Sequence, residues 1–361
     1  MRIQNFASSL VVTGGGTGGH YFPAIAIAEG ARVRWRERPI IFVGSKRGIE
    51  SRLLMQSDWP YLLLDVEGFV GRSPGKILKA GWKLALACDR LRTVWECNRP
   101  WAVVGTGGYG SAPALLAARS LGIPFFLHES NAKPGLLVRY LASSAAGIWC
   151  GMDAVRVHLS GARCIFTGTP VRSSFLRSFN PVYVGGVQSC FRLLVLGGSG
   201  GASALNRAVL TMAPVLLDRF PMLSILHQVG ENEFKHLTSI VTNARHRIVP
   251  FLNQMDVEME AATLVITRSG ASTCAELMVC GRPAIMVPMP NSAGNHQVVN
   301  AQAMVDDGRA LMVRQTDNLS NDLLDRVSAL VVNPELLSSM SITTGNKSVA
   351  VCLENLHAML N

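Results

Sequence analysis

The run LVVTGGGTGGH at Leu10–His20 decides the fold, because it joins a short apolar segment to a glycine loop. The helix predicted over Pro23–Arg34 follows, and a strand, a glycine loop and a helix in this order begin a parallel βαβ unit. The same order recurs from Arg192, where the loop GGSGGA spans Gly197–Ala202. The chain is therefore expected to be α/β, with two similar domains.

Apolar runs of this kind alternate with predicted helices along the whole chain, which favours sheets covered on both faces. A polar stretch between Pro170 and Pro181 suits a domain boundary. We expect an N-terminal domain over 1–172 and a C-terminal domain over 173–344, with the helix of 345–361 able to pack back on the first. The predicted strands are Leu10–Thr13, Ile40–Val43, Tyr61–Leu64, Ala102–Gly105, Pro124–Leu127, Gly147–Trp149, Arg192–Leu196, Leu223–Val229, Arg247–Val249, Leu264–Thr267, Pro283–Val287 and Ala310–Val313.

Composition narrows the class of protein. The 361 residues are 48% hydrophobic, with no run approaching a membrane span, and Met1–Leu10 does not read as a signal peptide. Eight cysteines without CxxC spacing indicate reduced thiols and neither zinc nor disulfides. Through Arg172 the chain holds 21 Lys and Arg against 10 Asp and Glu, whereas the remainder holds 13 against 14. A basic first half favours an anionic membrane or phosphates, and without interleaved aromatic residues it does not favour nucleic acid.

The loop Gly14–His20 carries more glycine than a turn requires, which favours close approach of its backbone to an anionic ligand at a helix N-terminus. Binding of NAD would need an acid at the end of the second strand, but Val43 is followed by Gly-Ser-Lys. His20 closes the loop, and a helix N-terminus favours the neutral imidazole that a general base needs. A structural role for this histidine is the alternative.

Further polar loops follow predicted strands, at the edge where ligands bind in open α/β sheets. In the second half, Ser199 is placed to cap a helix or to donate to a phosphate. Glu276 ends the motif RSGASTCAE and lies just inside the helix that begins there, either as an acid favoured by the helix dipole or as an acceptor for two ribose hydroxyls. In the first half the loops are GTGGYG at Gly105–Gly110 and HESN at His128–Asn131.

Seven motifs occur in order along nearly the whole chain, and together they resemble the MurG family of bacterial UDP-N-acetylglucosamine:lipid I N-acetylglucosaminyltransferases, which complete lipid II. The resemblance implies a GT-B fold, two Rossmann-like domains with parallel sheets facing across a deep cleft. The motifs are GGGTGGH at Gly14–His20, GTGGYGSAP at Gly105–Pro113, HESN at His128–Asn131, GTPVR at Gly168–Arg172, GGSGGA at Gly197–Ala202, RSGASTCAE at Arg268–Glu276 and NHQVVNA at Asn295–Ala301.

The resemblance implies an inverting transfer from UDP-N-acetylglucosamine to the muramyl 4-hydroxyl of lipid I, with no metal or other cofactor required. It makes His20 the base, with Glu129 as the alternative. The remaining site residues are implied to bind the donor: Leu252 at uracil, Glu276 at ribose, Ser199, Ser272, Thr273 and Arg172 at the diphosphate, and His296, Gln297, Ala271 and Asn131 at the sugar, faced by Thr17, Gly18 and Gly19.

The chain departs from the family's usual residues at three positions. Ser130 and Gly200 stand where the family usually has Gln, and Asn295 replaces a common Asp. Gly200 puts donor affinity in question, but no candidate catalytic group is lost.

A lipid-linked acceptor implies contact with the membrane, as a peripheral protein on its cytoplasmic face. The segment Gly71–Arg92 is basic and contains Ile77, Leu78 and Trp82, which suits anionic inner-leaflet phospholipids. An ordinary helix with a core-facing stripe is the alternative. Other cell-wall synthesis proteins are further candidate partners, and nucleic acid is not.

Two other functions compete with this interpretation. A GT-B transferase acting on a diacylglycerol lipid would share the fold but usually lacks the HESN-type and GGTGGH signatures together. A non-catalytic nucleotide-binding subunit would be expected to lose His20, Glu276 or Gln297, and all three are present.

Overall fold

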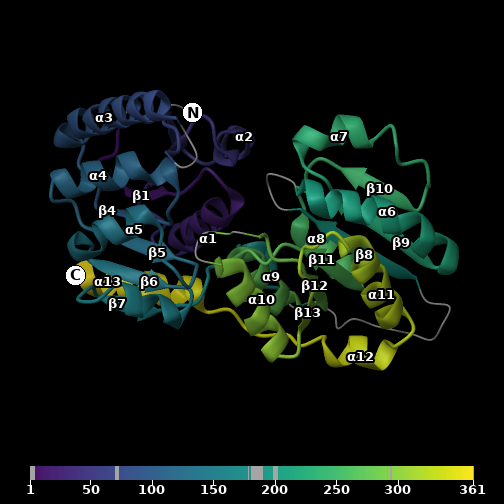
Figure 1. Cartoon of the computed structure of the whole chain (residues 1–361). Coiled ribbons are helices and arrows are strands. Elements are labelled where there is room, and N and C mark those ends of the chain that lie inside the picture. The colour runs from purple at the N-terminus through teal and green to yellow at the C-terminus, as the bar shows by residue number, and fades with distance from the viewer. Residues whose placement is uncertain are drawn as a thin grey trace. The chain divides into compact units, whose positions relative to one another are not determined.

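The structure is a computed structural model that describes residues 5–69, 73–177, 179, 190–197, 202–290, 292 and 295–360. The chain divides into two compact units (Figure 1). The first comprises Met1–Ser173 with Asn346–Asn361, and the second comprises Ser174–Gly345. This division falls one residue beyond the boundary expected at residue 172.

The first unit is built on a parallel sheet of seven strands in the order β3-β2-β1-β4-β5-β6-β7. The order reverses between β1 and β4, and such a switch point is where open α/β sheets bind ligands. The loops Gly14–His20 and Gly105–Gly110 follow these two strands. The strands are β1 (Leu10–Thr13), β2 (Ile40–Ser45), β3 (Tyr61–Leu64), β4 (Ala102–Gly105), β5 (Phe125–Glu129), β6 (Gly147–Cys150) and β7 (Cys164–Phe166).

Helices cover both faces of this sheet, because alternate residues of each strand point to opposite sides. Val11 belongs to one buried cluster, with α3 (Pro74–Cys97), α4 (Ala112–Ser120) and α5 (Leu136–Leu141). Leu10 and Val12 belong to the other, with α1 (Gly18–Arg34), α2 (Ile49–Met55) and α13 (Ser348–Leu360).

The C-terminal helix α13 therefore packs on the first unit, far from it in sequence. The Trp149 indole N–H donates to Asn355 Oδ1 at 2.8 Å. The Asn346 amide donates to Thr169 O at 3.1 Å. Cys352 and Leu356 complete the core under this helix.

The second unit repeats the plan with six parallel strands in the order β10-β9-β8-β11-β12-β13. Its switch point lies between β8 (Phe191–Leu196) and β11 (Leu264–Thr267), the strands that precede the loop at 197–202 and the segment 268–276. The other elements are α6 (Ser203–Arg219), β9 (Leu223–Gln228), α7 (Glu231–Leu237), β10 (His246–Val249), α8 (Met255–Ala261), α9 (Ala271–Cys280), β12 (Ala284–Met286), α10 (His296–Asp306), β13 (Ala310–Met312), α11 (Leu319–Val331) and α12 (Pro334–Ser339).

Several strands differ by one or two residues from the predicted bounds, and helix α1 and strand β7 differ more. Helix α1 begins at Gly18, five residues before Pro23, because Thr17 O accepts hydrogen bonds from the backbone N–H groups of His20 and Tyr21. Helix α6 continues through Pro214 to Arg219, although proline usually ends a helix. Strand β7 was not predicted, since it has only three residues, of which Cys164 and Ile165 are partly buried and Phe166 is exposed.

A pair of buried histidines in the second unit makes stability depend on pH. His227 and His246 stack with ring centroids 5.7 Å apart, and His227 Nε2 lies 3.1 Å from Asn206 Oδ1. Burial lowers the pKa of His227 to about 3, helped by the neighbouring His246, and burial lowers the pKa of His246 to about 4. In the folded protein both side chains therefore stay neutral between about pH 6.5 and pH 4. In the unfolded chain the same side chains take up protons over this range.

We expect the free energy of unfolding to fall as pH drops from about 6.5 toward 4, since only the unfolded chain gains these protons. Each histidine contributes a slope of up to about 1.4 kcal/mol per pH unit. His227→Gln should flatten this dependence, whereas the exposed His236→Gln should not. Urea denaturation at pH 7, 6 and 5 measures it, and equal slopes in the two variants would contradict the assignment.

Candidate active site

His20 lies in the first turn of α1, against the loop that follows β4. Its Nδ1 atom lies 2.9 Å from Thr106 O, and a carbonyl oxygen can only accept a hydrogen bond. The ring proton therefore sits on Nδ1, and Nε2 carries the lone pair. The Thr106 hydroxyl donates to His20 O at 2.6 Å. One residue thus fixes both the backbone and the ring of His20, in the tautomer of a proton acceptor.

Part of the glycine content of the loop at Gly14–His20 serves packing. A Cβ on Gly14 would lie 2.0 Å from Thr106 Oγ1, and one on Gly15 would lie 2.3 Å from the Glu50 carboxyl. Gly16 has a φ of +91° and packs on the Tyr109 ring. At Gly19 the nearest atom is Thr17 Oγ1 at 3.9 Å, so space is open there. The case for close ligand approach rests on Thr17 and Gly19, which are exposed, whereas Gly18 between them is buried.

Glu50, in α2, hydrogen-bonds to the backbone of the loop at Gly14–His20. It was not predicted as a site residue. It is fully buried, and its carboxylate accepts from Gly16 N–H at 2.8 Å and from Ser45 N–H at 3.0 Å. The buried Glu50 carboxylate already binds these two backbone donors and is unavailable to a ribose. The end of β2 therefore still lacks the acid that a dinucleotide site needs. Glu50 instead ties the end of β2 to the glycine loop that precedes His20.

Glu129 is 3% exposed at the end of β5 and organises the loop that follows. Its Oε1 accepts from the backbone and side-chain nitrogens of Asn131, both at 3.0 Å, and its Oε2 accepts from Gly135 N–H at 2.9 Å. With three donors on its two oxygens, the carboxylate is better suited to shaping the loop and orienting Asn131 than to taking a proton from a substrate.

Two other motif residues of the first unit have defined surroundings. His128 is buried with Nε2 3.1 Å from Gly168 O, and burial lowers its pKa to about 4. The Arg172 guanidinium lies 4.3 Å from the centroid of the Phe22 ring in α1. Arg172 is therefore placed on the first unit, at its end.

In the second unit, Arg268 fixes the backbone around the site. Its guanidinium donates to Val287 O at 3.0 Å and to Gln315 Oε1 at 2.7 Å, and burial lowers its pKa. Ser269 follows, and its hydroxyl donates to Gln297 O at 2.7 Å. These bonds hold the segment after β11 against β12 and α10.

Hydrogen bonds around Ser269 bring together the predicted site residues of α9 and those of α10. Asn300 donates to Ser269 O at 2.9 Å, which adds a second tie between α10 and the start of α9. Gln297 Oε1 accepts from Met289 N–H at 2.8 Å, so a direct bond from this side chain to a sugar hydroxyl would use its Nε2 group. The predicted residues that share this region are Ala271, Ser272, Thr273 and Glu276 on α9 with His296 and Gln297 on α10.

The remaining predicted donor residues are less defined. Glu276 is 6% exposed, in the second turn of α9, and Leu252 is 8% exposed, just after β10. Asn295 precedes α10 with a φ of +56°, a left-handed conformation that Asn tolerates better than most residues. Ser199 and Gly200 lie outside the described residues.

Three general features bear on the class of site. All eight cysteines are free. Within the described ranges, no group of three or more His, Cys, Asp and Glu side chains is placed to hold a metal ion. Among the helices of those same ranges, none has the length and apolar character to cross a membrane.

Comparison with known proteins gives matches over both units. The glycosyltransferase family 28 N-terminal domain matches residues 10–149, and the family 28 C-terminal domain matches residues 192–356. Two similar curated relatives are both UDP-N-acetylglucosamine--N-acetylmuramyl-(pentapeptide) pyrophosphoryl-undecaprenol N-acetylglucosamine transferases. The one from Syntrophotalea carbinolica is 37% identical over 92% of this chain and 92% of its own. The one from Myxococcus xanthus is 34% identical over 93% of this chain and 88% of its own.

Solved structures agree with this fold. MurG from Acinetobacter baumannii aligns with a TM-score of 0.67 and 25% identity, over 97% of this chain and 99% of that one. UDP-GlcNAc 2-epimerase from Neisseria meningitidis, bound to UDP-GlcNAc, gives a TM-score of 0.67 at 14% identity, over 97% and 99%. At that identity the second likeness concerns the fold alone.

Proposed function

This chain belongs to the MurG family of N-acetylglucosamine transferases, and from that premise we propose that it converts lipid I to lipid II. The reaction passes N-acetylglucosamine from UDP-N-acetylglucosamine to the 4-hydroxyl of the muramyl sugar, with inversion and release of UDP. Membership supports the reaction class and the two substrates. The 2.9 Å contact between His20 Nδ1 and Thr106 O is the observation that carries the catalytic assignment.

In this proposal His20 Nε2 accepts the proton of the muramyl hydroxyl as its oxygen attacks the anomeric carbon. The bond from that carbon to the β-phosphate oxygen breaks, and UDP leaves with the electron pair. Nδ1–H remains bound to Thr106 O, which stabilises the imidazolium that forms. The Thr17–Gly19 end of the glycine loop is assigned to the substrates beside it.

We assign the donor to the second unit, with no metal required. The start of α9 at Ala271–Thr273 offers a helix N-terminus to the diphosphate, where negative charge builds as UDP leaves. Glu276 takes the ribose hydroxyls, Leu252 the uracil through its backbone, and His296 and Gln297 the sugar. Asn131, Arg172 and Ser199 complete the proposed set.

Release of UDP tests the reaction. UDP-N-acetylglucosamine is incubated with and without a short-chain lipid-linked muramyl-pentapeptide pyrophosphate, and the disaccharide is sought by mass spectrometry. Acceptor-dependent release with this product is expected. Binding of UDP with no release to this acceptor, but with release to diacylglycerol, would overturn the acceptor assignment and leave the fold untouched.

We also propose that the protein is peripheral, on the cytoplasmic face of the membrane, and binds anionic phospholipid through α3. The buried face of α3 is formed by Ala80, Ala87, Leu91 and Trp95, which accounts for a core stripe. Ile77 lies on the same side of the helix as that stripe, near the helix start, and is 42% exposed, whereas Leu78 and Trp82 lie on the opposite side and are 78% and 68% exposed. A core-facing role therefore does not explain Leu78 and Trp82, and an amphipathic membrane contact does.

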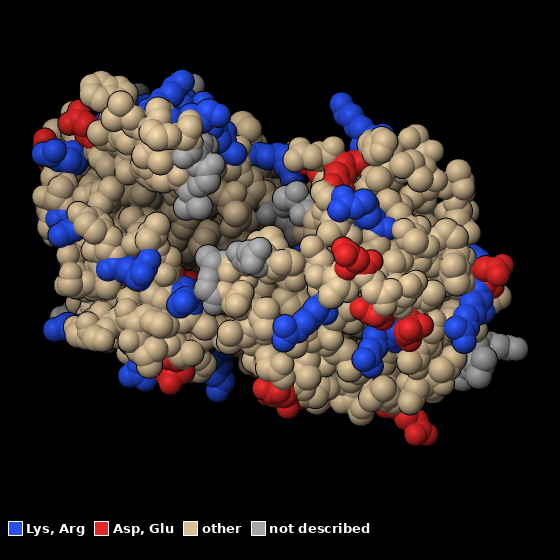
Figure 2. Space-filling model, viewed as in Figure 1, with Lys and Arg blue, Asp and Glu red and all other residues tan. Residues whose placement is uncertain are grey.

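Charge around these residues supports the same surface. Lys76 and Lys79 are exposed on the same helix, and Figure 2 shows blue side chains gathered over this end of the first unit. Each cation near an anionic surface adds about 1 kcal/mol to binding. The apolar and basic side chains thus favour one lipid-facing surface on α3.

Leu78→Glu combined with Trp82→Glu should weaken binding to phosphatidylglycerol-containing vesicles at least tenfold, because it removes apolar area and adds charge of the wrong sign. Val33→Glu is the matched control, since Val33 is 71% exposed on α1. Vesicle co-sedimentation measures the effect. If the control weakens binding as much as the double variant, the contact is not at α3.

A further inference from the structure

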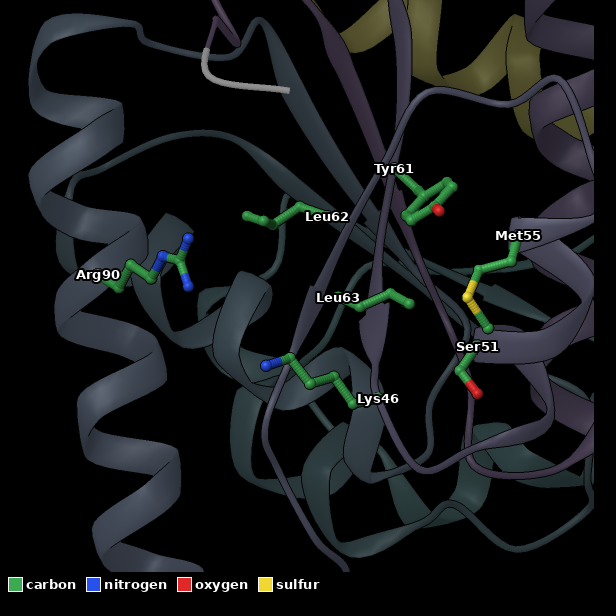
Figure 3. A pocket seen from close by; sticks show the side chains of 7 residues that line it. All are labelled: Lys46, Ser51, Met55, Tyr61, Leu62, Leu63 and Arg90. Carbon is green, nitrogen blue, oxygen red and sulfur yellow. The ribbon is translucent and has the colours of Figure 1, made fainter. Parts of the chain in front are cut away.

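A separate pocket lies at the free edge of the first sheet, where β3 is the outermost strand. Its volume is about 520 Å³, within the range of small-ligand sites. Most of its lining surface is apolar, and two cationic side chains, Lys46 and Arg90, also line it (Figure 3). The lining residues are Lys46, Ser51, Met55, Tyr61, Leu62, Leu63 and Arg90.

The two cations of this edge pocket have no acidic partner among the residues that the structure describes. Lys46 and Arg90 are exposed, and neither makes an ion pair within the described ranges. The neighbouring cations differ. Arg47 pairs with Asp65 at 3.3 Å and with Glu67 at 3.0 Å. Lys83 reaches the same two acids, at 3.0 and 2.6 Å.

Those acids are therefore already shared between two cations, and the edge pocket keeps a local excess of positive charge. Figure 3 shows the Arg90 guanidinium extending from α3 and the Lys46 ammonium directed toward the same side of β3. An anion between them would gain two charge-assisted contacts, which are stronger than neutral hydrogen bonds.

The strand between them adds apolar walls and backbone donors. Leu62 projects to the side of Arg90, and Tyr61 and Leu63 project to the side of Met55 (Figure 3). Pro60 O accepts from Phe42 N–H of β2 at 2.8 Å, and Leu64 O accepts from Lys46 N–H, just after β2, at 2.9 Å. In a parallel ladder alternate residues face the partner strand, so the N–H groups of Tyr61 and Leu63 point away from β2.

The edge pocket continues the proposed lipid-facing surface of α3. Trp82, Leu86 and Arg90 follow one another at steps of four residues, which keeps them along one side of the helix. Trp82 and Leu86 are 68% and 54% exposed. The rise of a helix puts Arg90 about 12 Å from Trp82 along the axis. This continuity favours a ligand drawn from the membrane.

We propose that the edge pocket binds one anionic phospholipid, with its phosphate between Lys46 and Arg90 and its apolar part against Tyr61, Leu62 and Leu63. The assignment rests on the proposed membrane association. It adds to that association a defined site for a single lipid molecule. None of the lining residues belongs to the switch-point loops or to the candidate active site, so we assign the pocket no catalytic role.

Calorimetric titration of the full chain with dihexanoyl phosphatidylglycerol, kept below its micelle concentration, tests the pocket without a membrane. We expect saturable binding of dihexanoyl phosphatidylglycerol. Dihexanoyl phosphatidylcholine and glycerol phosphate should each bind at least tenfold more weakly than this lipid. Lys46→Ala with Arg90→Ala should weaken phosphatidylglycerol binding at least tenfold. Met55→Glu should do the same by repulsion, and Met55 is 61% exposed, so this change spares the core.

Lys76→Ala with Lys79→Ala is the matched control. It removes the same charge from the lipid-facing surface, so it should weaken vesicle binding and leave short-chain lipid binding intact. Equal weakening of short-chain lipid binding by both double variants would overturn the pocket. Glycerol phosphate binding as tightly as the lipid would make it a phosphate site and would also overturn the proposal.

The two membrane proposals fail separately. Vesicle binding without saturable short-chain binding removes the edge pocket and keeps the α3 surface. Saturable short-chain binding without vesicle binding keeps the pocket and removes the membrane association. Transfer to a detergent-soluble acceptor should be unchanged in Lys46→Ala with Arg90→Ala, since neither residue belongs to the candidate active site.

Discussion

His20→Ala should lower kcat for transfer by about 10²–10⁴-fold, the usual contribution of a general base. UDP binding should be unchanged, because the residues assigned to the uracil and the ribose, Leu252 and Glu276, belong to the other unit. The reason is the geometry of the ring: Thr106 O holds Nδ1–H, and Nε2 is the atom left to accept the proton. Steady-state rates with a soluble acceptor and calorimetry with UDP give the two readouts.

Glu129→Gln separates the two candidate bases. The Glu129 carboxylate accepts three hydrogen bonds within its own loop, so the amide variant should act mainly through that loop. We expect a smaller loss of kcat in Glu129→Gln than in His20→Ala. Full activity in His20→Ala would remove His20 from the mechanism, and a larger loss in Glu129→Gln would transfer the role.

Glu50→Gln should reduce the free energy of unfolding by about 2–4 kcal/mol, since an amide cannot accept from both backbone donors without directing its own NH₂ group at one of them. The donors are Gly16 N–H and Ser45 N–H, and the site is fully buried. Because the Gly16 bond holds the loop that leads to His20, kcat should also fall at least tenfold.

Denaturation by urea and steady-state rates measure the two effects. Glu37→Gln removes a carboxylate from an exposed position and is the control. If Glu50→Gln matches this control in both measurements, the buried carboxylate does not position the loop. If stability falls but kcat does not, Glu50 is structural alone.

Local pattern was sufficient for the strands that carry the site. The bounds of β1, β3, β4 and β11 are those predicted, because each is a short apolar run that ends at a glycine or a polar residue. The glycine loop after β1, the acid in α9 and the start of α10 at His296 are also local features. Membership of the MurG family agrees with the function that the ordered motifs implied.

Contacts between distant residues were not visible in that pattern. An acid was sought at the end of β2 and none was found, yet Glu50 turns back from α2 to Gly16, 34 positions away. The glycines of the loop were attributed to a ligand, and several instead make room for Glu50, Thr106 and Tyr109. Their partners come from other strands and helices, so no spacing in the sequence predicts them.

The sequence by itself determined the α/β class, the strand–loop–helix units and the family, because these depend on periodicity and on motifs read in order. Only the tertiary structure decided which face of α3 is buried, which nitrogen of His20 carries the proton and that Lys46 and Arg90 line one pocket. Each of these depends on contacts between residues that are far apart in the sequence and that the sheet topology brings together. The hydrophobic pattern of the sequence does not predict which of these residues make contact.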